Sequence, residues 1–177
     1  LRIHLRAPTG TRIEEMTALT GRVEGRVRAL IPKERIASVV NNIGLPISGI
    51  NISYGNSGTI GTFDADMLVT LNQGEGASTA ALTRSLRERL PQDFPGMTFS
   101  FLPADIVSQI LNFGSPAALD VQVAGTNVEG GRGYANKLLA RVRRVAGVAD
   151  ARIQEQSKNP ALRVDFNRAF AGVVGLT

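Results

Sequence analysis

The fold is decided by residues 1–30, LRIHLRAPTG TRIEEMTALT GRVEGRVRAL, because the spacing of the apolar residues changes within them. Over residues 1–7 apolar side chains alternate with polar ones, as in a half-exposed strand with one polar face: Ile3 and Leu5 against Arg2, His4 and Arg6. Further on, apolar residues recur every three or four positions, as on one face of a helix: Ile13, Met16, Leu19, Val23, Val27 and Leu30. Thr11 and Glu14 have the spacing of a capping box, and Pro32 closes the helix.

The following residues extend this strand and helix to a complete unit. Strands are predicted around residues 35–41, 67–71 and 97–101, with a further extended piece at 47–54. A second helix is predicted over 78–90, with three leucines in line and Pro91 at its end. The resulting order, β-α-β-β-α-β within about 100 residues, is that of the ferredoxin-like split βαβ unit.

The pattern then starts again after a connection that holds a short apolar helix at 106–111. We expect a strand at 119–123, a helix capped by Asn127, and strands near 149–154 and at 162–166. Arg26-Val27-Arg28 recurs as Arg141-Val142-Arg143 at the same point of each first helix, which indicates internal duplication. The predicted fold is therefore α+β, with two ferredoxin-like split βαβ subdomains, the second incomplete; their expected bounds are 1–112 and 113–177.

The composition limits the chemistry that the chain can perform. It has 177 residues, 43% of them apolar, no cysteine and one histidine, so disulfides, thiolate catalysis and histidine-rich metal sites are excluded. The net charge of +5 is spread over 20 basic and 15 acidic residues, which favours a mixed-charge surface over a nucleic-acid site. No run of apolar residues is long enough to span a bilayer, and we expect the sequence to be a piece of a longer protein.

A glycine-rich loop is the first candidate site. Gly55, Gly58 and Gly61 precede Thr62-Phe63 and a strand, whereas a phosphate-binding loop needs a lysine and a helix there. A long connection is the plain interpretation. Glycine hinges beside one large aromatic, Phe63, also suit a gate that moves over a ligand.

The charged residues allow two interpretations each. Arg2, His4 and Arg6 either line a solvated strand face, which is favoured, or bind an anion or act in catalysis. Asp64 and Asp66 are expected to be exposed loop acids rather than ligands of Ca²⁺ or Mg²⁺. The three methionines and the pair Phe99 and Phe101 are expected in the core.

Several stretches, in this order, resemble the second periplasmic segment of RND (resistance–nodulation–division) efflux transporters of the AcrB-like kind, over essentially the whole chain. These stretches are residues 2–15, 42–46, 66–71, 94–96, 103–106, 109–114, 119–123 and 164–177. The resemblance implies the porter subdomains of the C-terminal half, without cofactor, metal or catalytic residues. It also implies a proton-driven homotrimer with a periplasmic adaptor protein and an outer-membrane channel, and a place in the periplasmic portion of a bacterial inner-membrane protein, the fragment itself being soluble.

The resemblance also implies site residues. The substrate cleft of the family would be lined by Arg2, His4, Leu119, Val121 and Val123. Its switch loop would be Gly55, Asn56, Ser57, Gly58, Thr59, Ile60, Gly61, Thr62 and Phe63. The loop has one aromatic, and the first strand carries Arg and His where apolar residues are frequent in drug pumps. Heavy-metal members of the family use methionines near the cleft, whereas the methionines here fall elsewhere, so an organic amphiphile is the expected substrate, with no nucleic acid bound.

Three alternatives remain open at this point. The first is a free-standing ferredoxin-like domain that binds a small ligand or RNA, but its third strand, residues 67–71, lacks the basic and aromatic RNA-binding motif. The second is a heavy-metal efflux member of the same superfamily. The third is an acylphosphatase-like hydrolase, for which Pro8 removes one of the backbone amides that would bind phosphate. We therefore expect a transport module and no enzyme.

Overall fold

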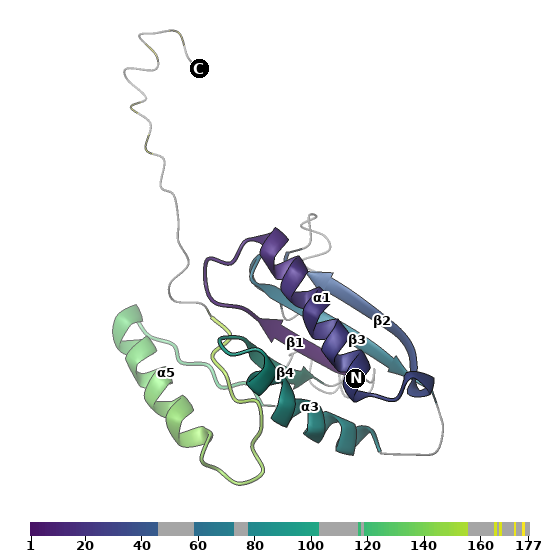
Figure 1. Ribbon diagram of the computed structural model, residues 1–177. Helices are drawn as coiled ribbons and strands as arrows, with labels where there is room; N and C mark the ends of the chain where they lie inside the picture. Colours follow the sequence, from purple (N-terminus) through teal and green to yellow (C-terminus); the bar gives the residue numbers. More distant parts are fainter. Residues whose placement is uncertain are drawn as a thin grey trace.

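The computed structural model describes residues 1–45, 59–72, 78–102 and 119–155, together with the single residues 117, 165, 167, 172 and 175. Its first part contains the predicted order of elements, with a short 3-10 turn, η1 (Lys33–Arg35), before the second strand. These elements are β1 (Arg2–Arg6), α1 (Ile13–Leu30), β2 (Ile36–Ile43), β3 (Asp64–Leu71), α3 (Thr79–Asp93) and β4 (Thr98–Leu102) (Figure 1).

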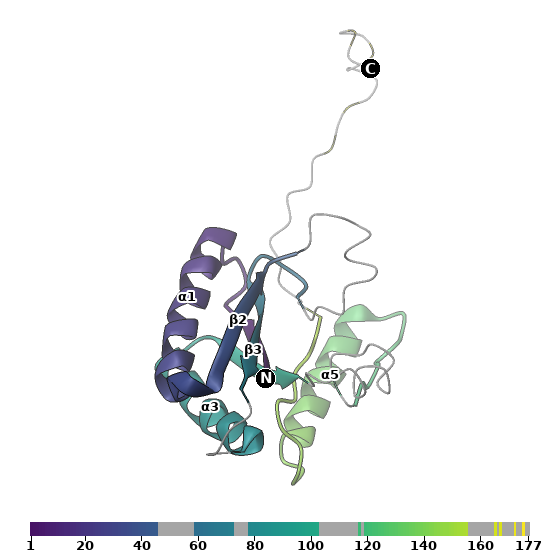
Figure 2. The ribbon, with the colours of Figure 1, turned by 90° about the vertical axis from the view of Figure 1, so that its right-hand side faces the viewer.

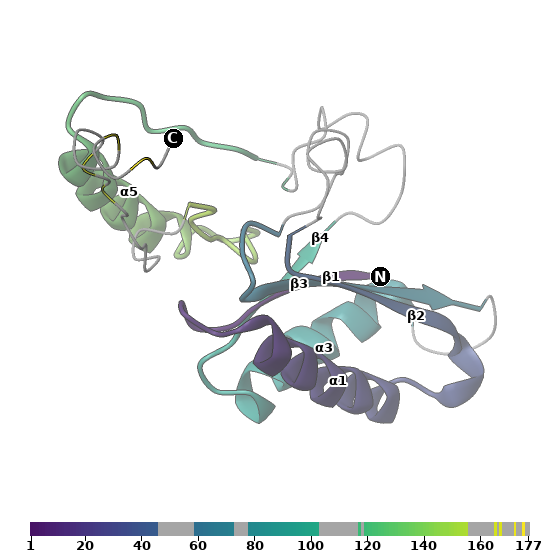
Figure 3. The same cartoon turned by 90° about the horizontal axis from the view of Figure 1, so that it is seen from above.

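The four strands form one antiparallel sheet in the order β2-β3-β1-β4. The first strand is therefore central, between β3 and β4. Both α1 and α3 cover the same face of the sheet, and α5 (Val128–Val142) lies on the other side of it (Figures 2 and 3). Among the described residues the mixed α+β class is thus confirmed.

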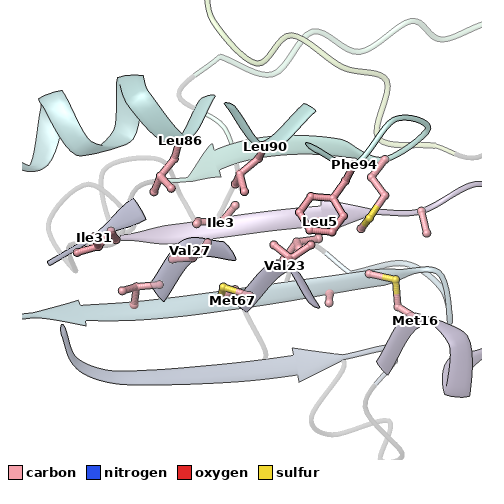
Figure 4. Close-up of a cluster of buried hydrophobic side chains, with 14 of the residues drawn as sticks. Ile3, Leu5, Met16, Val23, Val27, Ile31, Met67, Leu86, Leu90 and Phe94 are labelled. Atoms are coloured by element: carbon pink, nitrogen blue, oxygen red, sulfur yellow. The ribbon is translucent and has the colours of Figure 1, made fainter. Parts of the chain in front are cut away.

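The core lies between the sheet and its two helices (Figure 4). Period two along the strands directs Ile3, Leu5 and Met67 to the helical face. The helices contribute the buried residues of their predicted apolar stripes to the same core: Met16, Val23 and Val27 from α1, and Leu82, Leu86 and Leu90 from α3. Met16, Met67 and Met97 are all buried, so the expectation that the methionines belong to the core is confirmed.

Three details of these elements differ from the prediction. The third strand begins at Asp64, not at residue 67, because Asp64 and Asp66 pair with β1. The capping box does not form: Arg12 is the N-cap of α1 without a side-chain cap, and the Thr11 hydroxyl donates to Pro8 O instead. Helix α3 runs to Asp93, past Pro91, which lies in its last turn.

The second unit departs further from the prediction. Helix α5 forms where expected, and the Asn127 side chain accepts from Gly130 N as its N-cap. Residues 119–123 and 149–154 were expected to be strands, but they pair with no strand among the described residues. Alternation alone does not make a strand, because each strand needs a partner for its backbone hydrogen bonds. The extended piece at 47–54, the helix at 106–111 and the strand at 162–166 lie outside the described residues, except Asp165.

In the described residues, no helix is both long enough and apolar enough to cross a membrane.

Candidate functional site

The sheet face opposite α1 and α3 carries a row of charged side chains on β1 and β3. Arg2, His4 and Arg6 alternate with the core residues of β1, and in the register of the two strands His4 lies opposite Asp66 and Arg6 opposite Asp64. The face was expected to be solvated. Instead, His4 is 1% exposed and Asp64 is fully buried, so the prediction of a wet strand face and of exposed loop acids is wrong.

The charges of this row can be buried because they pair with one another. The guanidinium of Arg6 donates to both carboxylate oxygens of Asp64, from Nε at 2.7 Å and from Nη2 at 3.1 Å. Ile60 N donates to the same carboxylate at 2.9 Å. Arg2 donates to Asp66 Oδ2 at 2.8 Å. Bidentate and charge-assisted hydrogen bonds of this kind offset the desolvation that burial costs a charge.

His4 joins the two ion pairs. Its Nδ1 lies 2.8 Å from Asp66 Oδ1, and its Nε2 lies 3.7 Å from Asp64 Oδ1. Burial by itself raises the pKa of Asp66, but the hydrogen bonds and charges of His4 and Arg2 outweigh it and lower the pKa to about 2. Because Asp66 is then ionised, Nδ1 carries the proton of this hydrogen bond. His4 Nε2 is buried and has no hydrogen-bond partner in the described part of the chain.

Ser100 of β4 lies opposite His4, so a serine, a histidine and an aspartate occupy three adjacent strands in one register. Such a set suggests nucleophilic catalysis. However, in the described residues His4 Nε2 makes no hydrogen bond, and both His4 and Ser100 are buried. The three side chains therefore do not form a hydrogen-bonded triad in the described part of the chain.

The segment after α5 attaches to this row. Arg6 Nη1 donates to the carbonyl oxygens of Ile153 and Gln154, at 3.3 Å each. A second attachment is Asp150, whose carboxylate accepts two hydrogen bonds from Arg87 of α3, at 2.9 and 2.7 Å, and one from Phe101 N of β4 at 3.0 Å. Residues 150–154 are therefore tied both to the charged row and to the β4 edge of the sheet.

The predicted cleft residues lie on two separate segments of the described chain. Arg2 and His4 lie in the charged row, with the contacts given above. Leu119, Val121 and Val123 lie on the extended segment before α5 and are 81%, 68% and 40% exposed. None of the hydrogen bonds or ion pairs of His4 reaches that segment.

The predicted switch loop is described only from Thr59 onward; Gly55, Asn56, Ser57 and Gly58 lie outside the described residues. Phe63 was expected to offer its ring to a ligand, but it is buried in the core. A Cβ on Gly61 would lie 2.4 Å from the Phe63 ring, so Gly61 is required for this packing. Thr59 is buried as well, whereas Thr62 is exposed and its hydroxyl donates to Thr11 O.

Three residues of the charged row and its attachment were missed or misjudged from the sequence: Asp64, Asp66 and Asp150. The first two follow each other at period two, which continues the alternation of Met67 and Val69 and could have extended the predicted strand to them. Asp150 adopts a positive φ of 57° after Gly147, a conformation that Asp tolerates better than most residues.

Comparisons with known proteins place this fold. No family model and no curated protein matches the chain. Among solved structures, one crystal form of a heavy metal efflux pump matches with a TM-score of 0.73 and 22% identity, over 99% of this chain and 17% of that chain. Another crystal form matches with a TM-score of 0.78 and 20% identity, over 99% of this chain and 18% of that chain.

The chain thus has the fold of a segment that makes up less than a fifth of an efflux pump. The resemblance to an efflux transporter that was noted in the sequence is confirmed as a likeness in fold along nearly the whole chain.

Proposed function

We propose that this chain is part of the periplasmic porter region of a proton-driven RND efflux transporter. The observation that carries the proposal is the likeness in fold over 99% of the chain to one segment of a pump. In this proposal residues 1–112 are a ferredoxin-like porter subdomain, which the strand order β2-β3-β1-β4 and the alternation of helices and strands support. Residues 113–177 are the leading part of a second subdomain.

The proposed role is that of a transport module and not of an enzyme. The single histidine is buried between two carboxylates, and its unpaired nitrogen cannot meet a substrate. The complete transporter would be a homotrimer in the bacterial inner membrane, working with a periplasmic adaptor and an outer-membrane channel. Arg2, whose side chain is partly exposed, and the segment 119–123 would then belong to the two sides of its substrate cleft, with the buried His4 behind Arg2 on the same strand.

The substrate class has two candidates. We favour a small organic amphiphile, because Leu119, Val121 and Val123 present exposed apolar surface and all three methionines are buried, away from any cargo. The alternative is a heavy metal ion, because the solved protein of similar fold is a heavy metal efflux pump. In the described residues, no group of three His, Cys, Asp or Glu side chains is placed to hold a metal ion.

The test uses the complete open reading frame that contains this chain. The frame should encode about a dozen membrane-spanning helices, and expression in an efflux-deficient bacterium should lower the accumulation of an organic dye. Tolerance to copper, silver and zinc salts is measured in the same strains. Metal tolerance without dye export would transfer the assignment to metal efflux, and a frame without membrane helices would refute the transporter proposal itself.

A further inference from the structure

Arg152 differs from the other arginines around the charged row because it forms no ion pair with any residue in the described part of the chain. Arg2 pairs with Asp66, Arg6 with Asp64 and Arg87 with Asp150. Arg152 makes one hydrogen bond, from Nε to the side-chain oxygen of Gln154 at 3.3 Å. In the described part of the chain its two terminal nitrogens have no protein partner.

The surroundings of Arg152 make this charge costly. Partial burial lowers the pKa of Arg152, and the nearby charge of Arg6 lowers it further, while Asp150, Asp66 and Asp64 act in the opposite direction. Those three carboxylates are already occupied by Arg87, Arg2 and Arg6. Four arginines therefore face three aspartates, and the surplus positive charge is that of Arg152.

The position of Arg152 leaves its guanidinium within reach of a ligand. The residue is half-buried, on the segment that Arg6 holds against the sheet face. On the same face the cross-strand pair Val40 and Leu68 is exposed, next to Arg2 in the register. A guanidinium presents a planar fork of donors that matches two oxygens of a carboxylate, sulfate or phosphate group.

We propose that Arg152 forms the cationic centre of an oxyanion-binding site on the sheet face opposite α1 and α3. The ligand group is a carboxylate, sulfate or phosphate that accepts hydrogen bonds from both terminal nitrogens and neutralises the surplus charge. A free inorganic anion and the head group of an amphiphile present the same chemistry to Arg152. They differ in whether Val40 and Leu68 take part, since only an amphiphile has a chain to place there.

The proposal is tested on the ¹⁵N-labelled 177-residue chain by following the Arg152 Nε–Hε resonance, assigned by its loss in Arg152→Lys. Sodium sulfate should shift this resonance saturably, whereas sodium chloride at equal ionic strength should not. Arg152→Gln keeps one NH2 donor but loses the charge and one of the two hydrogen bonds, so it should weaken sulfate binding, measured by calorimetry, about tenfold. Arg89→Gln, which removes the same charge from an exposed position of α3, should leave it unchanged.

The two sources of the oxyanion are separated by comparing sulfate with octyl sulfate below its micelle concentration. Tighter binding of octyl sulfate that is lost in the double variant Val40→Ser, Leu68→Ser identifies an amphiphile, and equal binding of both identifies a free anion. An Arg152 resonance that sulfate and octyl sulfate leave unmoved would overturn the proposal. The same conclusion would follow if Arg89→Gln weakened binding as much as Arg152→Gln, since binding would then reflect net charge alone.

Discussion

Asp66 is the residue at which burial and charge oppose each other most directly. Its pKa of about 2 lies below the ordinary value of 3.8, so between these values the unfolded chain binds a proton that the folded chain does not. The stabilisation is therefore complete above about pH 4 and is lost as the pH falls towards 2. At about 1.4 kcal/mol for each unit of pKa shift, the Asp66 carboxylate contributes roughly 2 kcal/mol to the free energy of unfolding.

The matching measurement is urea unfolding at pH 5, 3.5 and 2.5. The unfolding free energy of the wild-type chain should fall over this range, and Asp66→Asn should remove about 2 kcal/mol of the fall. Asp93→Asn removes a carboxylate from the half-exposed pair with Arg26 and should leave the slope nearly as in the wild type. An identical slope in wild type and Asp66→Asn would show that the His4–Asp66–Arg2 contacts do not act on stability.

The ion pair of Arg6 with the fully buried Asp64 should also contribute to stability. Arg6→Gln should cost about 3–5 kcal/mol, since it leaves a buried carboxylate without its counter-ion. Adding Asp64→Asn should recover part of that loss, so the double-mutant cycle gives a favourable coupling energy. Arg26→Gln breaks the half-exposed pair with Asp93 and should cost less than about 1 kcal/mol. Additive effects of the two buried substitutions would contradict the pairing.

At the scale of elements, helix α5 differs from α1 and α3 in what it buries. The described residues of α5 include no buried side chain, whereas α1 buries Met16, Thr20, Val23 and Val27. Apolar burial is the main source of helix stability in proteins, so α5 should open at lower free energy. We expect its amides to exchange with deuterium well before those of α1 and α3, as measured by mass spectrometry of peptic peptides.

Asp150 tests how the segment after α5 is held. In Asp150→Asn the new side chain tolerates the positive φ but lacks the charge that binds Arg87. Amide hydrogen exchange should therefore accelerate in residues 143–155 and stay unchanged in β1 and β3. Asp120→Asn, on the exposed segment before α5, is the control. Acceleration throughout the sheet would show that Asp150 supports the whole fold and not this attachment.

The sequence predicted the elements of the first unit, residues 1–102, better than those that follow it. The first unit was predictable because each apolar stripe meets a partner in the same 102 residues, as Ile3, Met16 and Leu86 do in one core. The strands at 119–123 and 149–154 were not, because alternation does not reveal whether a partner strand is present. The charged row was misjudged for a related reason: the burial of Arg6 depends on Asp64, more than 50 residues away, and on residues 153–154.

At the scale of the whole molecule, the switch loop that the sequence predicts at residues 55–63 allows a test that separates gating from folding. Gly61 packs against the Phe63 ring, so Gly61→Ala should displace that ring from the core. This should lower the free energy of unfolding by about 1–3 kcal/mol and reduce the abundance of the complete transporter.

Gly58→Pro acts differently, because it restricts the backbone of the loop, where glycine supplies conformations that other residues rarely adopt. If the loop gates passage, Gly58→Pro should reduce export of a large dye more than of a small one, at wild-type abundance and trimer content. The measurement is dye accumulation in cells with matched amounts of each transporter, with Glu88→Ala at an exposed position of α3 as control. Wild-type export of both dyes by Gly58→Pro would leave this segment a connection between β2 and β3 with no part in transport.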